Sequence, residues 1–240
     1  MVRITVFNGS PRGENSNTNR MVGEFLKGAV EACAEVENIF LVDKKIGHCR
    51  GCFVCWIKTP GKCVIHDDIH DLTEKFISSD IVVLATPVYV DGVTGIMKNF
   101  MDRLIPIVDP HFTKDENGET RHVMRYRRYP RMVIISNCGF PDNDHFQVVS
   151  HHYHRMARNM HSEVIGEIYR SMGPILEFPN PMVEPMRIKY RKLLRKAGKE
   201  IVEKGRLSEE SRKKLEAPIV PPRMYFDGAN KGFDRQLSKL

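Results

Sequence analysis

Four of the six cysteines fall within fifteen residues, as Cys49, Cys52, Cys55 and Cys63. Two, two and seven residues separate them in turn. Thiolates at such short intervals can hold a metal ion or an iron–sulfur cluster, and they can also act as redox thiols. Zinc ribbons usually carry two separated C-x2-C pairs, a pattern that this segment lacks. The segment therefore predicts metal or redox chemistry, with a cluster, zinc and free thiols all open.

A polar loop follows the first apolar run of the chain. Residues 2–7 (VRITVF) are rich in β-branched types, which is typical of a buried strand. Hydroxyl and amide side chains fill the loop 8–18, and Ser16 or Asn17 is expected to cap a helix there. Free N–H groups at a helix N-terminus attract anions, and Arg12 can add charge-assisted hydrogen bonds to a phosphate. The loop lacks the P-loop ending and the GxGxxG pattern, so it predicts a phosphate site of another kind.

Two further loops follow predicted strands and could hold a planar ring. Residues 86–92 (TPVYVDG) have a backbone fixed by proline and glycine, and Tyr89 offers an aromatic face. Residues 137–141 (NCGFP) are expected to close the same ring site from the other side through Asn137, Gly139 and Phe140. All three loops come at carboxyl ends of strands, where ligands of open α/β sheets bind.

Strands and helices that alternate along the chain must position these loops. Strands are expected at 2–7, 36–42, 81–85, 132–136 and 163–168, and helices at 16–33, 67–77, 96–104, 146–160 and 186–205. Asn117-Gly118 indicates a hairpin inside the polar stretch 109–130. From Pro218 the proline-rich end is expected to be an extended arm.

This order predicts an α/β fold with a doubly wound, five-stranded parallel sheet in the flavodoxin-like order 2-1-3-4-5 and helices on both faces. We expect a domain at 1–180 that carries the cysteine loop 47–65 and the insertion 109–130. A basic helical extension is expected at 181–240.

Several of these motifs together resemble the NADPH-dependent FMN reductase family, and especially its iron-sulfur flavoprotein branch. The resemblance rests on residues 9–12 with 16–18, on 86–89, on 98–103 and on 139–141, and it spans about 1–170. It implies that the first loop binds the FMN phosphate through Ser10, Arg12, Ser16, Asn17 and Thr18. It implies that the second loop contacts the isoalloxazine through Pro87, Val88, Tyr89 and Val90. It also implies a [4Fe-4S] cluster on the four clustered cysteines.

The charge of the chain is concentrated at one end. The net charge is +7, and residues 181–240 hold 16 Lys/Arg and 8 Asp/Glu, which gives this tail +8 and the rest of the chain −1. Without a recognised nucleic-acid module, we expect a solvated or subunit-bridging helix here rather than a nucleic-acid partner. No signal peptide or membrane-spanning run is visible, so a cytoplasmic protein without a membrane partner is expected.

The sequence thus predicts an FMN-binding oxidoreductase that takes hydride from NAD(P)H and reduces a small-molecule electron acceptor. The alternative is an iron–sulfur flavoprotein in which a ferredoxin-like donor feeds a [4Fe-4S] cluster and then FMN. A second alternative is a non-catalytic flavin- or nucleic-acid-binding module. The resemblance and the insertion 109–130 suggest a homodimer or homotetramer. No residue is assigned a catalytic role.

Overall fold

The computed structural model describes residues 1–177 and 181–239, and its centre is a five-stranded parallel sheet. The strands are β1 (Arg3–Asn8), β2 (Glu35–Phe40), β3 (Ile81–Pro87), β6 (Arg131–Asn137) and β7 (Val164–Arg170). They lie in the order β2-β1-β3-β6-β7. Counted among themselves this is 2-1-3-4-5, so the predicted topology is confirmed.

The central strands are continuous apolar runs in the sequence because both of their faces are buried. In β3, every residue from Ile81 to Thr86 is buried, because helices cover both faces of the sheet. The edge strand β2 instead alternates between exposed and partly or fully buried residues. Only three of its six residues, Val36, Ile39 and Phe40, are apolar.

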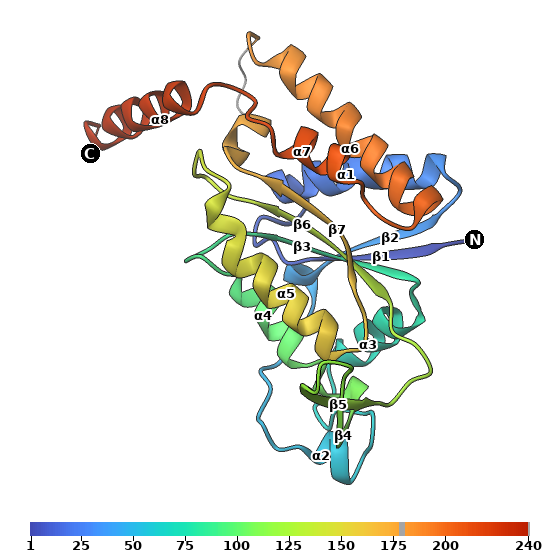
Figure 1. The fold of residues 1–240 in the computed structure, drawn as a ribbon. Coiled ribbons are helices and arrows are strands. Elements are labelled where there is room, and N and C mark those ends of the chain that lie inside the picture. Colours follow the sequence, from blue (N-terminus) through green and yellow to red (C-terminus); the bar gives the residue numbers. More distant parts are fainter. Residues whose placement is uncertain (178–180, 240) are drawn as a thin grey trace.

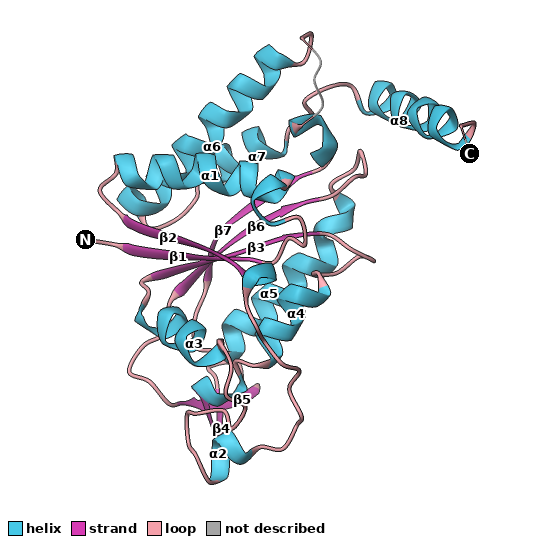
Figure 2. Ribbon diagram, turned by 180° about the vertical axis from the view of Figure 1, so that it is seen from behind, coloured by secondary structure: helices cyan, strands magenta, loops and turns pink. Residues whose placement is uncertain are grey.

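Two helical layers enclose the sheet (Figures 1 and 2). One face carries α1 (Asn17–Glu31), α6 (Glu184–Lys204) and α7 (Glu209–Glu216). The other face carries α3 (Ile69–Ser78), α4 (Gly95–Asp102) and α5 (Gln147–Asn159). The first layer buries Phe25 and Ile201 in one core, and the second buries Phe76, Phe100 and Tyr153 in another.

The basic tail is part of this packing. Helix α6 lies against α1 and buries Tyr190, Leu194, Ala197 and Ile201 in the core. The expectation of a merely solvated or subunit-bridging helix is wrong for α6. The charged residues hid a sparse apolar stripe, which suffices to seat one face of a long helix.

A smaller unit lies beyond the helical layer of α3, α4 and α5, on the side away from the sheet (Figure 1). It contains the short helix α2 (Val54–Ile57) and the antiparallel hairpin of β4 (Val108–Lys114) and β5 (Thr120–Met124). The predicted hairpin turn is confirmed, with Gly118 at φ +77°. The indole N–H of Trp56 donates to the carbonyl of Ile105 at 3.0 Å, which ties the cysteine segment to the hairpin. Short 3-10 helices lie at Gly13–Asn15, Leu41–Asp43, Ile105–Ile107, Asp144–Phe146 and Gly173–Leu176.

The chain ends in α8 (Pro222–Leu237), where an extended arm was expected. That expectation is wrong because Pro222 occupies the first helical position, where a missing N–H costs nothing. In the part of the chain that is described, no helix combines the length and the apolar character needed to cross a membrane.

Candidate functional site

A cavity opens at the carboxyl ends of β1, β3 and β6, with open space of about 460 Å³. Its lining contains ten of the twelve residues predicted to bind a cofactor: Ser10, Arg12, Ser16, Asn17, Thr18, Pro87, Val88, Tyr89, Asn137 and Gly139. Cys138 and Pro174 complete it. Three loops far apart in sequence therefore meet at the edge of the sheet where the topology predicts a ligand.

The first turn of α1 forms one end of the cavity. Ser16 caps this helix, because its hydroxyl accepts from the N–H of Asn19 at 3.0 Å and donates to the carbonyl of Gly13 at 2.7 Å. Ser10 and Thr18 lie beside it with only 1–2% of their surface exposed. Buried hydroxyl groups at a helix N-terminus suit an anion such as a phosphate.

Gly9 allows the first loop to lie close to α4. A Cβ atom at this position would lie 2.7 Å from the Cβ of Met97, which no side chain can tolerate. Thr94 secures the contact, since its hydroxyl donates to the carbonyl of Gly9 at 2.6 Å. The glycine of the GSPR motif is thus required for packing.

Asn137 joins the three loops. Its side-chain amide donates to the hydroxyl of Thr18 at 2.7 Å, and its carbonyl accepts from the N–H of Val88 at 2.8 Å. Both Asn137 and Thr18 are buried. The floor of the cavity is therefore held by direct hydrogen bonds between the loops, before any ligand is bound.

Two predicted ring-binding residues lie outside the cavity lining. Val90 is fully exposed and has φ +49°, a strained value for a β-branched residue. Phe140 is half exposed, and its ring stacks on His145 with centroids 3.8 Å apart. Their roles stay predictions.

Arg12 carries an ion pair that the sequence did not reveal. Its guanidinium lies 3.0 Å from Glu177, a residue 165 positions later in the chain. Both side chains are more than a third exposed, so this pair is open to solvent and to exchange with another anion. The predicted role of Arg12 toward phosphate stays a prediction.

The polar lining fits FMN in two respects. Asn17 has a buried side-chain oxygen without a hydrogen-bond partner among the described residues, so it can accept from a ligand. A Cβ atom added to Gly139 would meet no other atom within 4 Å, so open space adjoins the backbone of this loop. The cavity therefore offers an anion site at one end and a backbone-lined wall at the other.

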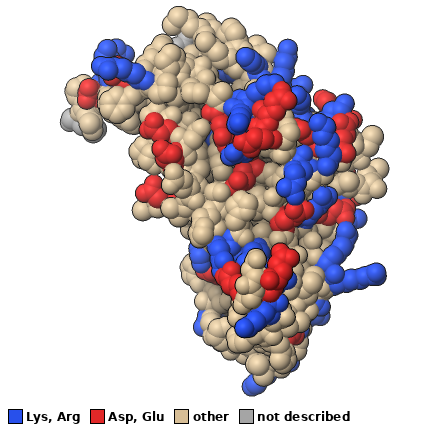
Figure 3. Space-filling view, in the orientation of Figure 1, with Lys and Arg blue, Asp and Glu red and all other residues tan. Residues whose placement is uncertain are grey.

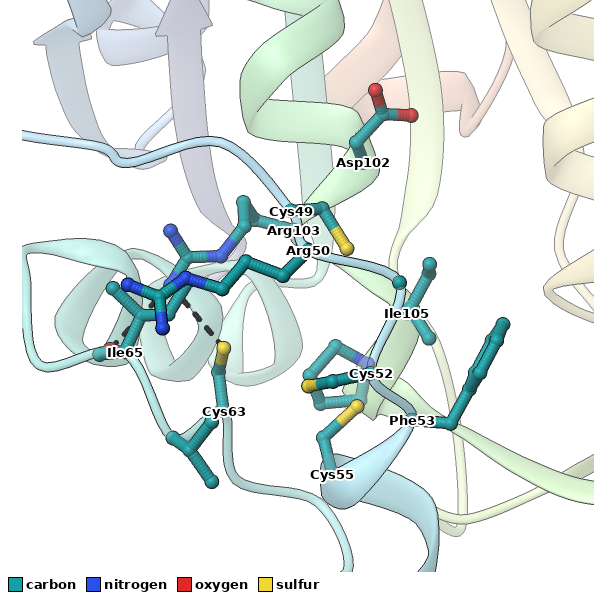
Figure 4. A pocket seen from close by; sticks show the side chains of 13 residues that line it. Cys49, Arg50, Cys52, Phe53, Cys55, Cys63, Ile65, Asp102, Arg103 and Ile105 are labelled. Carbon is teal, nitrogen blue, oxygen red and sulfur yellow. Dashed lines mark hydrogen bonds between the residues drawn. The ribbon is translucent and has the colours of Figure 1, made fainter.

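The four clustered cysteines line a second cavity together with Arg103 (Figure 4). Gly51 at φ +62° and Phe53 at φ +51° curl the chain between the first three cysteines. Cys63 enters from the other side of the cavity. The compact spacing seen in the sequence thus places all four thiols around one space.

Arg103 and Asp67 form a buried ion pair beside these thiols. The guanidinium, 1% exposed, donates to Asp67 at 2.7 Å and to the sulfur of Cys63 at 3.3 Å. Burial acts to raise the pKa of Asp67, but hydrogen bonds from Arg103, Gly47 and Ile69 outweigh it and hold that pKa below its ordinary value. Asp67 stands at the start of the helix predicted over 67–77, and nothing local could pair it with a residue 36 positions away.

The four thiols of this cavity could hold a metal ion or an iron–sulfur cluster. Within the described chain, no three His, Cys, Asp or Glu side chains converge as ligands of a single ion. A tetrahedral zinc ion and a cubane cluster both take four cysteine thiolates. Burial raises the pKa of the Cys55 thiol. The neighbouring thiols raise it further, because a thiolate is less stable close to other thiolates. The four gathered thiols are the donor set that a cluster takes, and cluster, zinc and free thiols all stay open.

Helix α4 connects the two cavities. Its N-cap Thr94 supports the first loop of the cavity at the strand ends, while Asp102 and Arg103 at its other end line the cysteine cavity. Eight residues of α-helix span about 12 Å. The two sites thus share one rigid element.

The sequence profile of a family described as NADPH-dependent FMN reductase matches residues 2–124, which is half of the chain. An iron-sulfur flavoprotein of Archaeoglobus fulgidus is 42% identical over 98 residues, covering 41% of this chain and 43% of that protein. An iron-sulfur flavoprotein of Methanosarcina thermophila is 30% identical over 104 residues, covering 43% of this chain and 53% of that protein. The chain spans about half the length of the curated relatives it matches.

Solved structures agree on the fold. An FMN-dependent NADH-azoreductase from Bacillus anthracis, in complex with FMN, superposes with a TM-score of 0.62 at 17% identity, over 85% of this chain and all of that one. An NAD(P)H:quinone oxidoreductase from Methanothermobacter marburgensis gives 0.57 at 12% identity, over 83% and 96%. At these identities the likeness establishes the flavodoxin-like fold alone.

Proposed function

We propose that this chain, which belongs to the NADPH-dependent FMN reductase family, is an NAD(P)H-dependent flavin oxidoreductase with FMN in the cavity at the strand ends. The observation that carries the proposal is the meeting of the three predicted loops around one polar cavity. When bound, FMN supplies a ring that takes hydride from NAD(P)H and passes electrons to a small-molecule acceptor. The class of acceptor is a quinone, a free flavin or oxygen.

The chain's own residues would bind and orient the cofactor. Ser10, Ser16 and Thr18 would hold the phosphate at the positive end of α1. The backbone of residues 87–89 and 137–139 would hold the ring edge, since both segments line the same wall. Asn137 would keep these segments in register.

The direct test is reduction of the bound flavin without oxygen. Mixing the FMN-loaded protein with NADPH or NADH should bleach the flavin absorbance at a rate that saturates with nicotinamide concentration. The variant Thr18→Val keeps the side-chain shape and should weaken FMN binding roughly tenfold, because it removes a buried hydroxyl. Thr113→Val on the distant hairpin is the control. Flavin that stays oxidised with both nicotinamides would refute the reductase proposal.

A second candidate function is supported by the cysteine cavity. In this version the four cysteines hold a [4Fe-4S] cluster, a ferredoxin-like donor reduces it, and the electrons go on to FMN. Helix α4 favours the idea because its N-cap Thr94 contacts the first loop of the candidate flavin cavity and Asp102 at its other end lines the cysteine cavity. The relatives named iron-sulfur flavoproteins are consistent with it.

Iron and acid-labile sulfide analysis of protein purified without oxygen tests the cluster. About four irons per chain are expected, and Cys52→Ser should lower that value strongly. Cys33→Ser is the control, since Cys33 is exposed at the end of α1 and outside the cavity. Wild-type protein that contains flavin and no iron would leave only the nicotinamide-dependent activity.

The proposal also covers the location of the protein in the cell and its oligomeric state. We place the protein in the cytoplasm, where its cysteines, all free in the described chain, would persist as thiols or ligands. A homodimer or homotetramer is proposed. The non-catalytic alternative has less support, because the cavity is built like a cofactor site.

A further inference from the structure

A third cavity lies between α3 and the smaller unit that carries the cysteine segment and the hairpin (Figure 1). It encloses open space of about 840 Å³, against about 460 Å³ for the candidate flavin cavity. One side of α3, the end of the cysteine segment and the residues that flank the hairpin line it. The oxidoreductase function proposed above leaves this cavity without an occupant, although it has room for a ring compound smaller than FMN.

The floor of this third cavity is apolar. Helix α3 presents Ile69, Thr73 and Ile77 to it at every fourth position, which places all three on one face of the helix. Ile69 is buried, and Ile77 packs against the same core cluster. Pro106, ahead of the hairpin, adds a further buried apolar ring to the lining. A ligand that buries an apolar ring would therefore gain from this floor.

Two hydroxyl groups from separate segments line the same cavity. One belongs to Thr73, in the middle of the apolar face of α3. The other belongs to Tyr126, and it lies beside Gly61, because a Cβ atom added to that glycine would be 3.6 Å from the hydroxyl oxygen. The ring of Tyr126 meets the buried ring of Tyr129 edge-on, with centroids 6.2 Å apart, which fixes its direction. Two hydrogen-bond donors are thus held at the wall for a ligand that carries acceptor oxygens.

The lysine and the glutamate of the lining carry opposite charges. Lys62 comes from the cysteine segment and Glu74 from α3, and both side chains are exposed. The lining therefore offers no excess of one sign to an ion, and a ligand without net charge loses least on entering it. Together with the apolar floor and the hydroxyl donors, this favours a neutral ring compound with carbonyl groups.

Cys63 lines this cavity and the cysteine cavity alike. A molecule bound here lies next to the segment for which metal or redox chemistry is proposed. Among the acceptors named above, oxygen needs no cavity of this size, and FMN as a free flavin brings a doubly charged phosphate for which the lining has no excess of positive charge. A quinone is the acceptor class that is neutral, cyclic and equipped with two carbonyl oxygens.

We propose that this third cavity binds the quinone acceptor, with the ring on the apolar floor and the carbonyl oxygens accepting from the hydroxyls of Thr73 and Tyr126. The choice of a quinone rests on the proposed oxidoreductase function, whereas the cavity and its donors do not. In the overall reaction the quinone gains the hydride of NAD(P)H and one proton from water. It leaves as the hydroquinone, and NAD(P)⁺ is the other product.

Binding of tetramethyl-1,4-benzoquinone to the full-length, FMN-loaded protein tests the site without NAD(P)H. Every ring position of this probe is substituted, so it does not alkylate the exposed cysteines. Equilibrium dialysis should find saturable binding. Thr73→Phe should weaken it roughly tenfold or more, because the added ring fills the cavity. Asp71→Phe is the matched control, since Asp71 is exposed on α3 outside the cavity and should leave the affinity unchanged. Equal affinities of the two variants, or no saturable binding to the wild type, would overturn the proposal.

Two conservative variants test the recognition of the carbonyl groups. Tyr126→Phe and Thr73→Val each keep the shape of the side chain and remove one hydroxyl, so each should weaken binding of the probe roughly fivefold. Unchanged affinity in both would mean that the hydroxyls do not contact the probe, which would overturn the quinone class. Urea unfolding checks that each variant is folded. Bleaching of the flavin by NADPH is measured separately, so failure of the reductase proposal and failure of quinone binding are told apart.

Discussion

Asn137 connects two loops of the candidate flavin cavity through its hydrogen bond to Thr18. Asn137→Ala leaves the buried Thr18 hydroxyl without this partner, which should cost about 1–3 kcal/mol of folding stability. FMN affinity should fall as well, because the loops lose their register. Urea unfolding and fluorescence titration of the apoprotein measure the two effects. Asn143→Ala, which removes only an exposed bond to the carbonyl of Glu216, should change neither.

The thiol of Cys138 lies in the wall of the same cavity yet is 4% exposed. Burial raises its pKa to about 11, so it remains protonated as the pH rises through the neutral range and becomes a thiolate only near that value. Because the thiolate is the nucleophile, iodoacetamide at pH 7 should modify Cys138 roughly a hundredfold more slowly than the exposed Cys33. Peptide mass spectrometry gives both rates. Similar rates in the folded protein would contradict the burial, and denaturant should make the rates converge.

Loop positions at strand ends, together with the family resemblance, were enough to predict most of the residues that line the candidate flavin cavity. Loop residues at strand ends are local features, and the topology then brings them together. The partners of Arg12 and Arg103 were missed because Glu177 and Asp67 are distant in sequence and no local pattern links them. Long-range ion pairs on irregular segments depend on the finished fold.

At the scale of elements, α1 and α6 cross so closely that glycine is required at the contact. A Cβ atom at Gly198 would lie 1.9 Å from the carbonyl oxygen of Phe25, and one at Gly28 would lie 1.8 Å from that of Arg195. Gly198→Ala should therefore force the helices apart and cost about 3 kcal/mol or more. Gly23→Ala on α1 is the control, since its Cβ would meet no other atom within 4 Å and alanine favours the helix by up to about 1 kcal/mol. Urea midpoints that shift equally in both variants would contradict the close crossing.

The elements themselves were predicted with uneven success. Strands such as β3, buried on both faces, and helices with a strong apolar stripe, such as α1, are determined by local pattern. The C-terminal arm was misjudged because Pro218, Pro221 and Pro222 read as helix breakers, although proline is compatible with a helix's first turn. The packing of α6 was hidden by its charged residues, since few apolar positions are needed when the partner helix presents glycines.

At the scale of the whole molecule, the basic tail does not form a surface of one sign. At least ten of its sixteen Lys and Arg residues lie within 4 Å of a carboxylate, including Arg195 beside Glu24 and Arg206 beside Glu163. In Figure 3 blue and red groups alternate over the visible face. Neutralised cations displace few counterions from nucleic acid.

Duplex DNA should therefore bind this protein weakly, with a dissociation constant no tighter than about 10 μM near physiological salt. Fluorescence anisotropy with a labelled duplex at several salt concentrations measures both the affinity and its salt dependence. A shallow slope is expected, because most cations of the tail are ion-paired and, within residues 181–239, cations such as Lys189 and Lys192 are left to contact phosphates. Sub-micromolar binding with a steep slope that persists in K189Q/K192Q would mean that the ion-paired cations also contact phosphates and that the tail is a nucleic-acid surface after all.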